Sequence, residues 1–295
     1  MKTIQLFSIL FLLGISYQIT FAQNNIVITS PASPTPSADN IIIGVGAGNN
    51  TMTGVGNSIV GRSAGVNMTI GTNNSFFGIR SGSANTTASY NSFFGYRSGF
   101  ANTSGEGNAF FGSYAGGANT IGTNNSFFGR DAGFSNTIGA SNSFFGINSG
   151  QNNTTASYNS FFGYRSGFAN TSGEGNAFFG SYAGGANTIG TNNSFFGRDA
   201  GFTNTIGSQN TFFGHGAGFS NLDADSSTFV GRQAGYNSNA KQNTFVGAKA
   251  GFANVIGTDN VYMGDHAGRF SISNENTFVG GDAGFFNTSG EKMSL

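Results

Sequence analysis

Hydrophobic and polar positions recur along this chain with a period of 17 residues. The pattern Asn-Ser-Phe-Phe-Gly-x-x-Ala-Gly-x-x-Asn-Thr-x-Gly-x-x is repeated fifteen times between Asn40 and Gly290. A short, regular period predicts a solenoid, in which each copy buries its apolar face only against the copies before and after it. The glycine that follows the aromatic pair marks each copy, at Gly44, Gly61, Gly78, Gly95, Gly112, Gly129, Gly146, Gly163, Gly180, Gly197, Gly214, Gly231, Gly247, Gly264 and Gly280.

Within one copy, the pattern predicts short β-strands separated by turns. Two or three glycines, several asparagines and no apolar spacing of three or four residues disfavour a helix. The segments Asn-Ser-Phe-Phe-Gly and x-Ala-Gly-Phe-x-Asn are each typical of a short strand between turn-forming residues. We therefore expect an all-β fold, a parallel β-solenoid or β-roll of about fifteen 17-residue coils, roughly 70 Å long at about 4.8 Å per coil.

Three positions of the repeat allow very little variation. Glycine follows the aromatic pair in every copy and recurs four residues later, from Gly48 to Gly284, with Ala or Ser directly before it. This combination predicts a corner where backbones approach closely or φ is positive. Asparagine stands four residues before the first glycine in every copy except one, where Ser227 replaces it. Stacked asparagines of this kind predict a hydrogen-bonded ladder between coils.

The aromatic pair predicts an exposed row of rings. Neighbouring residues on a strand point to opposite faces, so a pair such as Phe93-Phe94 cannot place both rings in one core. The second member is always Ile, Val, Phe or Met, which favours the interior, whereas the first also admits Tyr262, which favours the outside. We expect an outward apolar row from Phe76 to Phe245, larger than a soluble monomer usually exposes. Because burying each ring is worth about 1.5–3 kcal/mol, the row predicts side-by-side self-association into a homo-oligomer.

Two longer regularities accompany the 17-residue period. Five residues after the first glycine, large and small residues alternate, as in Phe100, Gly117 and Phe134, which predicts rings lying over the gaps left by small residues. In addition, residues 89–134 and 157–202 are identical and lie 68 residues apart, which is four coils. This identity indicates duplication of a four-coil block.

The chain divides into four segments. Residues 1–22 are typical of a signal peptide, with a basic start at Lys2, a short apolar core and a small-residue cleavage site that ends at Ala22. Residues 23–39 contain all three prolines and predict an extended spacer. The repeat array covers residues 40–290, and we expect residues 291–295 to form an uncapped C-terminal tail. An exported protein at the cell surface or in the extracellular space is predicted.

Composition narrows the possible functions. Glycine occurs 49 times but without the three-residue period of collagen, and 33 phenylalanines make the chain too aromatic to stay unfolded. Cysteine is absent, so neither disulfides nor thiolate chemistry is available. Twelve basic residues balance twelve acidic ones. This balance provides no electrostatic footprint for nucleic acid or for anionic lipid.

Few residues are candidates for chemistry. The two histidines, His215 and His266, lie three coils apart without a second histidine or a cysteine nearby, so they predict neither a metal site nor a catalytic base. We predict a non-enzymatic protein with no catalytic, cofactor-binding or metal-binding residues and no small-molecule substrate. Carboxylates next to basic or small residues are expected to provide solubility and weak ion pairs. They are Asp131, Asp199, Asp265 and Asp282, beside Arg130, Arg198, His266 and Gly281.

Two other repeated features predict alternative binding functions. Nine threonines at 17-residue steps, from Thr69 to Thr205, form a regular row of the kind that could bind ice or another crystal. A row of three tyrosines, Tyr96, Tyr164 and Tyr236, could instead stack on sugars and bind a glycan. In either case, the β-solenoid would bind a ligand through one of its repeated rows rather than serve only as a structural element.

The repeat also resembles known bacterial surface proteins. The segments Asn74 to Ser81 and Asn125 to Ala132 resemble the head repeats of trimeric autotransporter adhesins, the YadA-like heads. Asn243 to Gly251 and Asn276 to Gly284 resemble the Asn-Thr-Phe-Val-Gly arrays of tail-fibre-like proteins. The resemblance implies a left-handed parallel β-roll, a homotrimer of chains lying side by side, and a role in adhesion or fibre building. A host or matrix surface, or a glycan on it, would then be the external partner.

Overall fold

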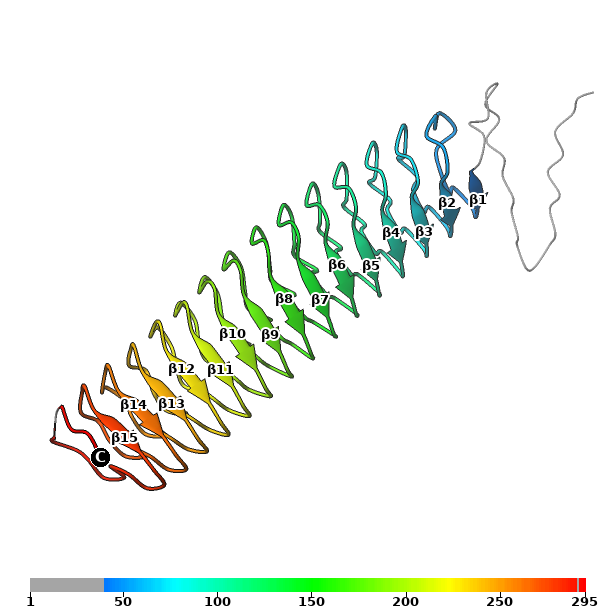
Figure 1. Cartoon of the computed structure of the whole chain (residues 1–295). Helices are drawn as coiled ribbons and strands as arrows, with labels where there is room; N and C mark the ends of the chain where they lie inside the picture. Colours follow the sequence, from blue (N-terminus) through cyan, green and yellow to red (C-terminus); the bar gives the residue numbers. More distant parts are fainter. Residues whose placement is uncertain (1–39, 291) are drawn as a thin grey trace, which may run out of the picture.

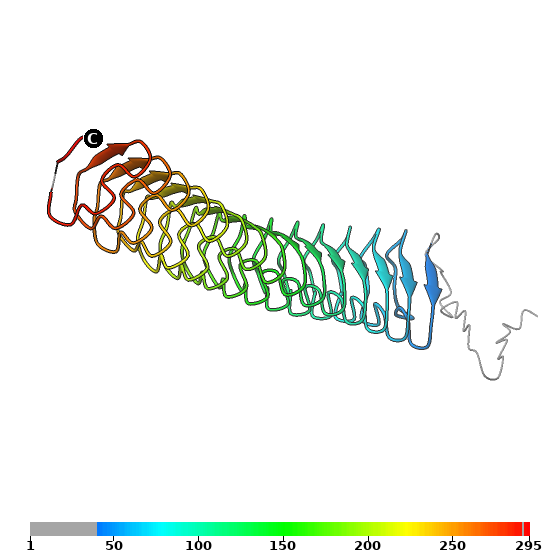
Figure 2. The same ribbon diagram turned by 90° about the horizontal axis from the view of Figure 1, so that it is seen from below.

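The chain winds into a long rod of stacked coils. The computed structural model describes residues 40–290 and 292–295. The predicted signal peptide (1–22) and spacer (23–39) lie outside these residues. Each coil contributes one short strand, and the strands follow one another along the rod in chain order (Figure 1). They keep to one side of the coils, and turns close the other side (Figure 2). The predicted all-β parallel solenoid is confirmed.

The described residues contain fifteen strands of three residues each, joined in one parallel sheet. Each residue pairs with its equivalent one coil later, so that Phe127 lies opposite Phe144. The strands are β1 (Ile41–Ile43), β2 (Ser58–Val60), β3 (Ser75–Phe77), β4 (Ser92–Phe94), β5 (Ala109–Phe111), β6 (Ser126–Phe128), β7 (Ser143–Phe145), β8 (Ser160–Phe162), β9 (Ala177–Phe179), β10 (Ser194–Phe196), β11 (Thr211–Phe213), β12 (Thr228–Val230), β13 (Thr244–Val246), β14 (Val261–Met263) and β15 (Thr277–Val279).

The predicted second strand of each coil is absent from these fifteen coils. The segment x-Ala-Gly-Phe-x-Asn forms consecutive turns instead. The reason is its backbone conformation: in the sixth coil, Asp131 and Gly133 both have φ of 57°. Left-handed residues at two alternate positions cannot continue an extended strand. One strand and a series of turns therefore make up each coil.

The last described residues continue the pattern of the coils. Ser294, in the segment that we expected to be an uncapped tail, forms a parallel bridge with Thr277 of β15. The backbone amide of Met293 donates a hydrogen bond to Asn276 Oδ1 at 3.0 Å. These contacts have the same register as those between the preceding coils.

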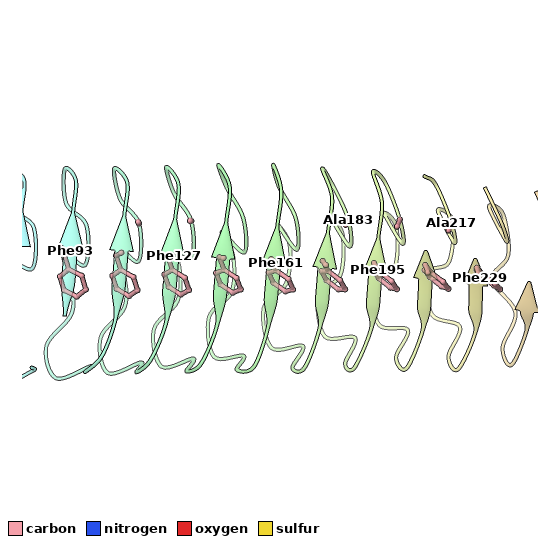
Figure 3. Close-up of a cluster of buried hydrophobic side chains, with 14 of the residues drawn as sticks. Phe93, Phe127, Phe161, Ala183, Phe195, Ala217 and Phe229 are labelled. Carbon is pink, nitrogen blue, oxygen red and sulfur yellow. The ribbon is translucent and has the colours of Figure 1, made fainter. Parts of the chain in front are cut away.

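The interior of the rod is filled by the first member of each aromatic pair, so the predicted orientation of the pair was wrong. The first-member side chains have no exposed surface from Ile59 in β2 to Phe278 in β15. Their rings form a continuous stack along the strands (Figure 3), with 4.8 Å between the ring centroids of Phe127 and Phe144. The expectation that one member faces inward and the other outward is correct, but the two faces are reversed.

The second glycine of the repeat explains why the first ring lies inside. Gly150 has φ of 55° and lies against the ring of Phe144, so close that a Cβ atom there would be 2.5 Å from ring atom Cε2. Only glycine leaves room for the ring at this distance. The same contact recurs in neighbouring coils, for example at Gly167, where a Cβ atom would be 2.4 Å from the ring of Phe161.

The first glycine of the repeat allows coils to stack at a corner. Gly129 has φ of 142°, and a Cβ atom there would be 2.4 Å from the carbonyl oxygen of Gly146 in the next coil. Any larger residue would push these backbones apart. The predicted corner is confirmed, because backbones approach closely at the first glycine and φ is positive at the second.

Two ladders of buried asparagines join the coils. In the predicted ladder, Asn74 donates its backbone amide to Asn57 Oδ1 at 2.9 Å and its side-chain amide to the carbonyl of Ala88 at 2.9 Å. The second ladder, which lies on the turn side, was not predicted from the sequence. There, Asn136 Nδ2 donates to Asn119 Oδ1 at 2.7 Å and to the carbonyl of Gly139 at 3.0 Å. The amides of Asn74 and Asn136 thus find their partners in their own coil and an adjacent one.

Candidate interaction surface

The outward face of the sheet has its own row of stacked phenylalanines. The second members of nine consecutive aromatic pairs form this outer ring row, which begins in β3 and ends in β11. Ring centroids are 4.6–4.8 Å apart from Phe77 to Phe196, and the last step to Phe213 is 5.9 Å. The row consists of Phe77, Phe94, Phe111, Phe128, Phe145, Phe162, Phe179, Phe196 and Phe213.

Stacking shields the ring faces in the outer ring row but leaves their edges open. The rings between the two ends are half-buried, whereas Phe77 is 36% exposed and Phe213, at the other end, is 58% exposed. Part of the apolar area is therefore already removed from water by the neighbouring coils. What remains is a narrow strip of ring edges along the rod.

The face around the outer ring row has no charge. The residue two positions before each outer ring points to the same side of the sheet. Across the fifteen described strands this position holds Ser, Thr, Ala, Ile or Val, and the outer-ring position holds Phe, Val, Ile or Met. Polar and aromatic side chains border the strip, such as Tyr90 before β4 and Arg130 after β6. An apolar centre with a mixed polar border is the usual composition of a protein interface.

The aromatic surface changes position towards the end of the rod. After Phe213, the outer positions of β12 to β15 hold Val230, Val246, Met263 and Val279. Another aromatic stack begins on the turns at this point, five residues after the first glycine. Its ring centroids are 4.8–5.3 Å apart, and its members are Phe202, Phe219, Tyr236 and Phe252.

The alternating column in the earlier coils packs as predicted. At Gly117, a Cβ atom would be 3.0 Å from the ring of Phe134, so this ring lies over the gap left by glycine. Tyr236 belongs to this column, where it stacks between Phe219 and Phe252. It therefore does not share a row with Tyr96 and Tyr164, as we had predicted.

Tyr96 and Tyr164 instead belong to two matching clusters at the corner that follows the strand. In the first cluster, Arg97 Cζ lies 5.4 Å from the ring centroid of Tyr96, 5.2 Å from that of Phe100 and 5.8 Å from that of Tyr114. The rings of Tyr96 and Tyr114 meet edge to face at 5.2 Å. The duplicated block repeats this arrangement around Arg165.

The threonine row uses its hydroxyl groups within the rod. Thr120 Oγ1 donates to the carbonyl of Thr137 at 3.0 Å, and Thr137 Oγ1 donates to that of Thr154 at 3.0 Å. The same bond recurs in every coil from Thr69 to Thr205. These hydroxyl protons are therefore not available to an ice surface.

The histidines lie beside carboxylates on the surface. His215 Nε2 is 2.6 Å from Arg198 NH2 and 3.9 Å from Asp199 Oδ2. His266 Nδ1 is 3.2 Å from Asp265 Oδ2 and 3.7 Å from a carboxylate oxygen of Asp282. The predicted weak pairs between neighbours are present, as Arg130 Nε and Arg198 Nε each lie 3.2 Å from the carboxylate of the following aspartate.

Two structural searches of residues 40–290 and 292–295 gave negative results. No three His, Cys, Asp or Glu side chains come together there in a group that could hold a metal ion. These residues also include no helix of sufficient length and apolarity to span a bilayer.

Comparison of the chain with protein-family models, with curated proteins and with solved structures found no match. The class that the fold itself defines is a repeat protein with a parallel β-solenoid.

Proposed function

We propose that this chain is a non-enzymatic structural rod that associates side by side with copies of itself and serves as an attachment or fibre element outside the cell. The observation that carries the proposal is the outer ring row: nine stacked rings on a sheet face without charge. The rod's export rests on the signal-peptide pattern of residues 1–22. The adhesive role, and a trimeric arrangement, rest on the resemblance to adhesin heads.

The dimensions of the sheet face suit a second copy of the chain. Fifteen strands at about 4.8 Å each, with three residues across at about 3.3 Å, give a face of roughly 700 Å². A stable interface buries about 800 Å² on each partner. A rod with the same repeat also presents the same ring spacing, so the edges of two outer ring rows can interlock along their whole length.

The absence of cysteine allows a direct test by crosslinking. Ser143 faces outward in β7, the middle strand of the outer ring row, so a Ser143→Cys variant brings two thiols together whether adjacent rods run parallel or antiparallel. We expect oxidation to give a covalent dimer. Thr155→Cys, on an exposed turn of the same region, is the matched control and should stay uncrosslinked. Equal behaviour of the two variants would contradict contact through the sheet face.

A second cysteine position distinguishes the orientation of the rods. Ser92 lies on the same face in β4, away from the middle of the sheet. A parallel bundle, as in the homotrimer that the resemblance implies, brings equivalent coils together, and Ser92→Cys should then crosslink as well as Ser143→Cys. An antiparallel pair would place β4 opposite β10, and only Ser143→Cys would crosslink.

A further inference from the structure

Arg97 and Arg165 each lie in a cage of aromatic rings that includes an exposed tyrosine. Arg269 lies in a similar cage, but its three rings are all phenylalanines. Each guanidinium lies among three aromatic rings, at centroid distances of 5.2–5.8 Å for Arg97 and 5.2–6.0 Å for Arg165. In both, the Nε atom is buried without a hydrogen-bond partner. The two clusters are geometric copies, because they belong to the identical blocks 89–134 and 157–202.

Neither arginine has an anionic partner within the described residues. No ion pair joins Arg97 or Arg165 to a carboxylate there, whereas Arg130 and Arg198 in the same blocks each pair with the following aspartate at 3.2 Å. A guanidinium offers five N–H donors in a flat fork that suits a carboxylate or sulfate group. Since aromatic rings already exclude water from one side, an anion bound here would be poorly screened and its interaction strengthened.

The neighbouring tyrosines present a surface for a sugar ring. Tyr96 is 41% exposed and Tyr164 is 42% exposed, although both belong to packed clusters. The C–H face of a pyranose packs well against an aromatic ring, and the tyrosine hydroxyl can hydrogen-bond to sugar hydroxyl groups. An arginine beside an exposed tyrosine thus matches a sugar that carries an acidic group.

We infer that Arg97 with Tyr96, and Arg165 with Tyr164, are two equivalent binding sites for an acidic polysaccharide that lies along the rod. The sites are four coils apart, about 19 Å at 4.8 Å per coil, so one polymer chain can occupy both. Occupation of both sites by one chain raises the overall affinity above that of either site, by about 10²–10⁴-fold where the geometry allows it. This inference rests on the proposed attachment role and names its ligand class, but it does not require self-association.

The test uses polygalacturonate as the probe and its fully methyl-esterified form as the uncharged control. Binding to the purified chain is measured by biolayer interferometry. We expect the acid polymer to bind and the ester to bind at least about ten-fold more weakly. Arg97→Gln and Arg165→Gln should each lower polymer affinity about ten-fold or more, because each leaves a single site. The double variant should lose binding.

Matched variants separate the site from a general effect of charge. Arg232→Gln removes an exposed arginine that has no ring cage and should leave binding within about two-fold of the original. The Arg97→Lys, Arg165→Lys double variant keeps both charges but loses the planar guanidinium groups. Its affinity should lie between that of the original chain and that of the double Gln variant. Absence of binding by the original chain, or equal binding by the double Gln variant and Arg232→Gln, would overturn the inference.

Polysaccharide binding and self-association can be tested independently of each other. A variant with serine at outer-row positions Phe111, Phe128, Phe145 and Phe162 should be monomeric and should still bind polygalacturonate through both arginines. Absence of self-association in the original chain would contradict only the role of the outer ring row. Absence of polysaccharide binding in a chain that still self-associates would contradict only the role of the arginine clusters.

Discussion

The two phenylalanine rows of the sheet differ in what covers them. Phe144 and Phe145 are adjacent in β7, and each belongs to a stack with ring spacings of 4.6–4.8 Å to its neighbours. The ring of Phe144 is closed in by Gly150 and has no exposed surface. The ring of Phe145, stacked between Phe128 and Phe162, is only half-buried.

This difference separates stability from association within a single strand. The inner row contributes its full burial to folding, because every ring is enclosed by its own coil and the next. The outer row contributes only what stacking buries. Its remaining apolar edges are available to another molecule, which is why we assign the interaction surface to the outer ring row.

Truncation of one ring in each row should show the largest contrast. Phe144→Ala should lower the free energy of unfolding by about 3–5 kcal/mol, the usual cost of a cavity in a packed core. Phe145→Ala should cost about 1 kcal/mol or less in the monomer, since its edges are already in water. Chemical denaturation of both variants, at concentrations where the chain is monomeric, measures the difference. Equal losses would mean that the two rows are equally enclosed.

Closing the space above the inner ring should be the next largest effect. A Gly150→Ala substitution places a methyl group within 2.8 Å of three ring atoms of Phe144 and a side chain at positive φ. Overpacking and backbone strain together should cost about 3 kcal/mol. Gln151→Ala, at the next and partly exposed position, is the control and should change the melting temperature little. A stable Gly150→Ala variant would contradict the observed contact.

Interruption of the second asparagine ladder should cost less. Asn136→Ala leaves Asn119 Oδ1 without its donor and Asn153 Nδ2 without one of its acceptors, and it removes one of the two side-chain donors to the carbonyl of Gly139. The expected loss is about 2 kcal/mol, because buried polar groups would remain unsatisfied. Thr137→Ala, which removes one half-buried hydroxyl, should cost clearly less. The two variants can be compared by thermal unfolding followed by circular dichroism.

The pH dependence of stability reports on the burial of Tyr262 in the inner row. Burial raises the pKa of its hydroxyl to about 12, although a hydrogen bond to Ser271 Oγ at 2.8 Å opposes the shift. The folded state therefore holds its proton more tightly than the unfolded state, whose pKa is near 10. The contribution of Tyr262 to stability should be complete below pH 10 and should be lost between pH 10 and 12. Tyr262→Phe should remove this part of the pH dependence, and an unchanged profile would contradict the burial.

The repeat predicted much of this architecture, because a period of 17 residues determines which residues must stack. The parallel coils, the glycine corners and the first asparagine ladder all follow from positions that tolerate almost no change. The orientation of the aromatic pair was mispredicted because Tyr262 was taken as a surface residue. Its hydroxyl is in fact accommodated inside by Ser271, at a position that asparagine occupies in most coils.

The remaining features depend on contacts that the period alone does not reveal. Non-glycine residues with positive φ, such as Arg97 at 53° and Tyr114 at 59°, exclude the second strand, but their residue types give no sign of it. The better clue to the inner row was the glycine four residues after the first, since its lack of a side chain requires a large neighbour. The arginine clusters combine residues from adjacent coils, so they became visible only in three dimensions.

The mass of the purified chain in solution tests the central claim most directly. Sedimentation equilibrium of the chain should give a multiple of its own mass, three-fold for the homotrimer. Serine at Phe111, Phe128, Phe145 and Phe162 should return it to the mass of one folded chain. A single rod that remains monomeric at all concentrations, with its outer ring row intact, would contradict the account.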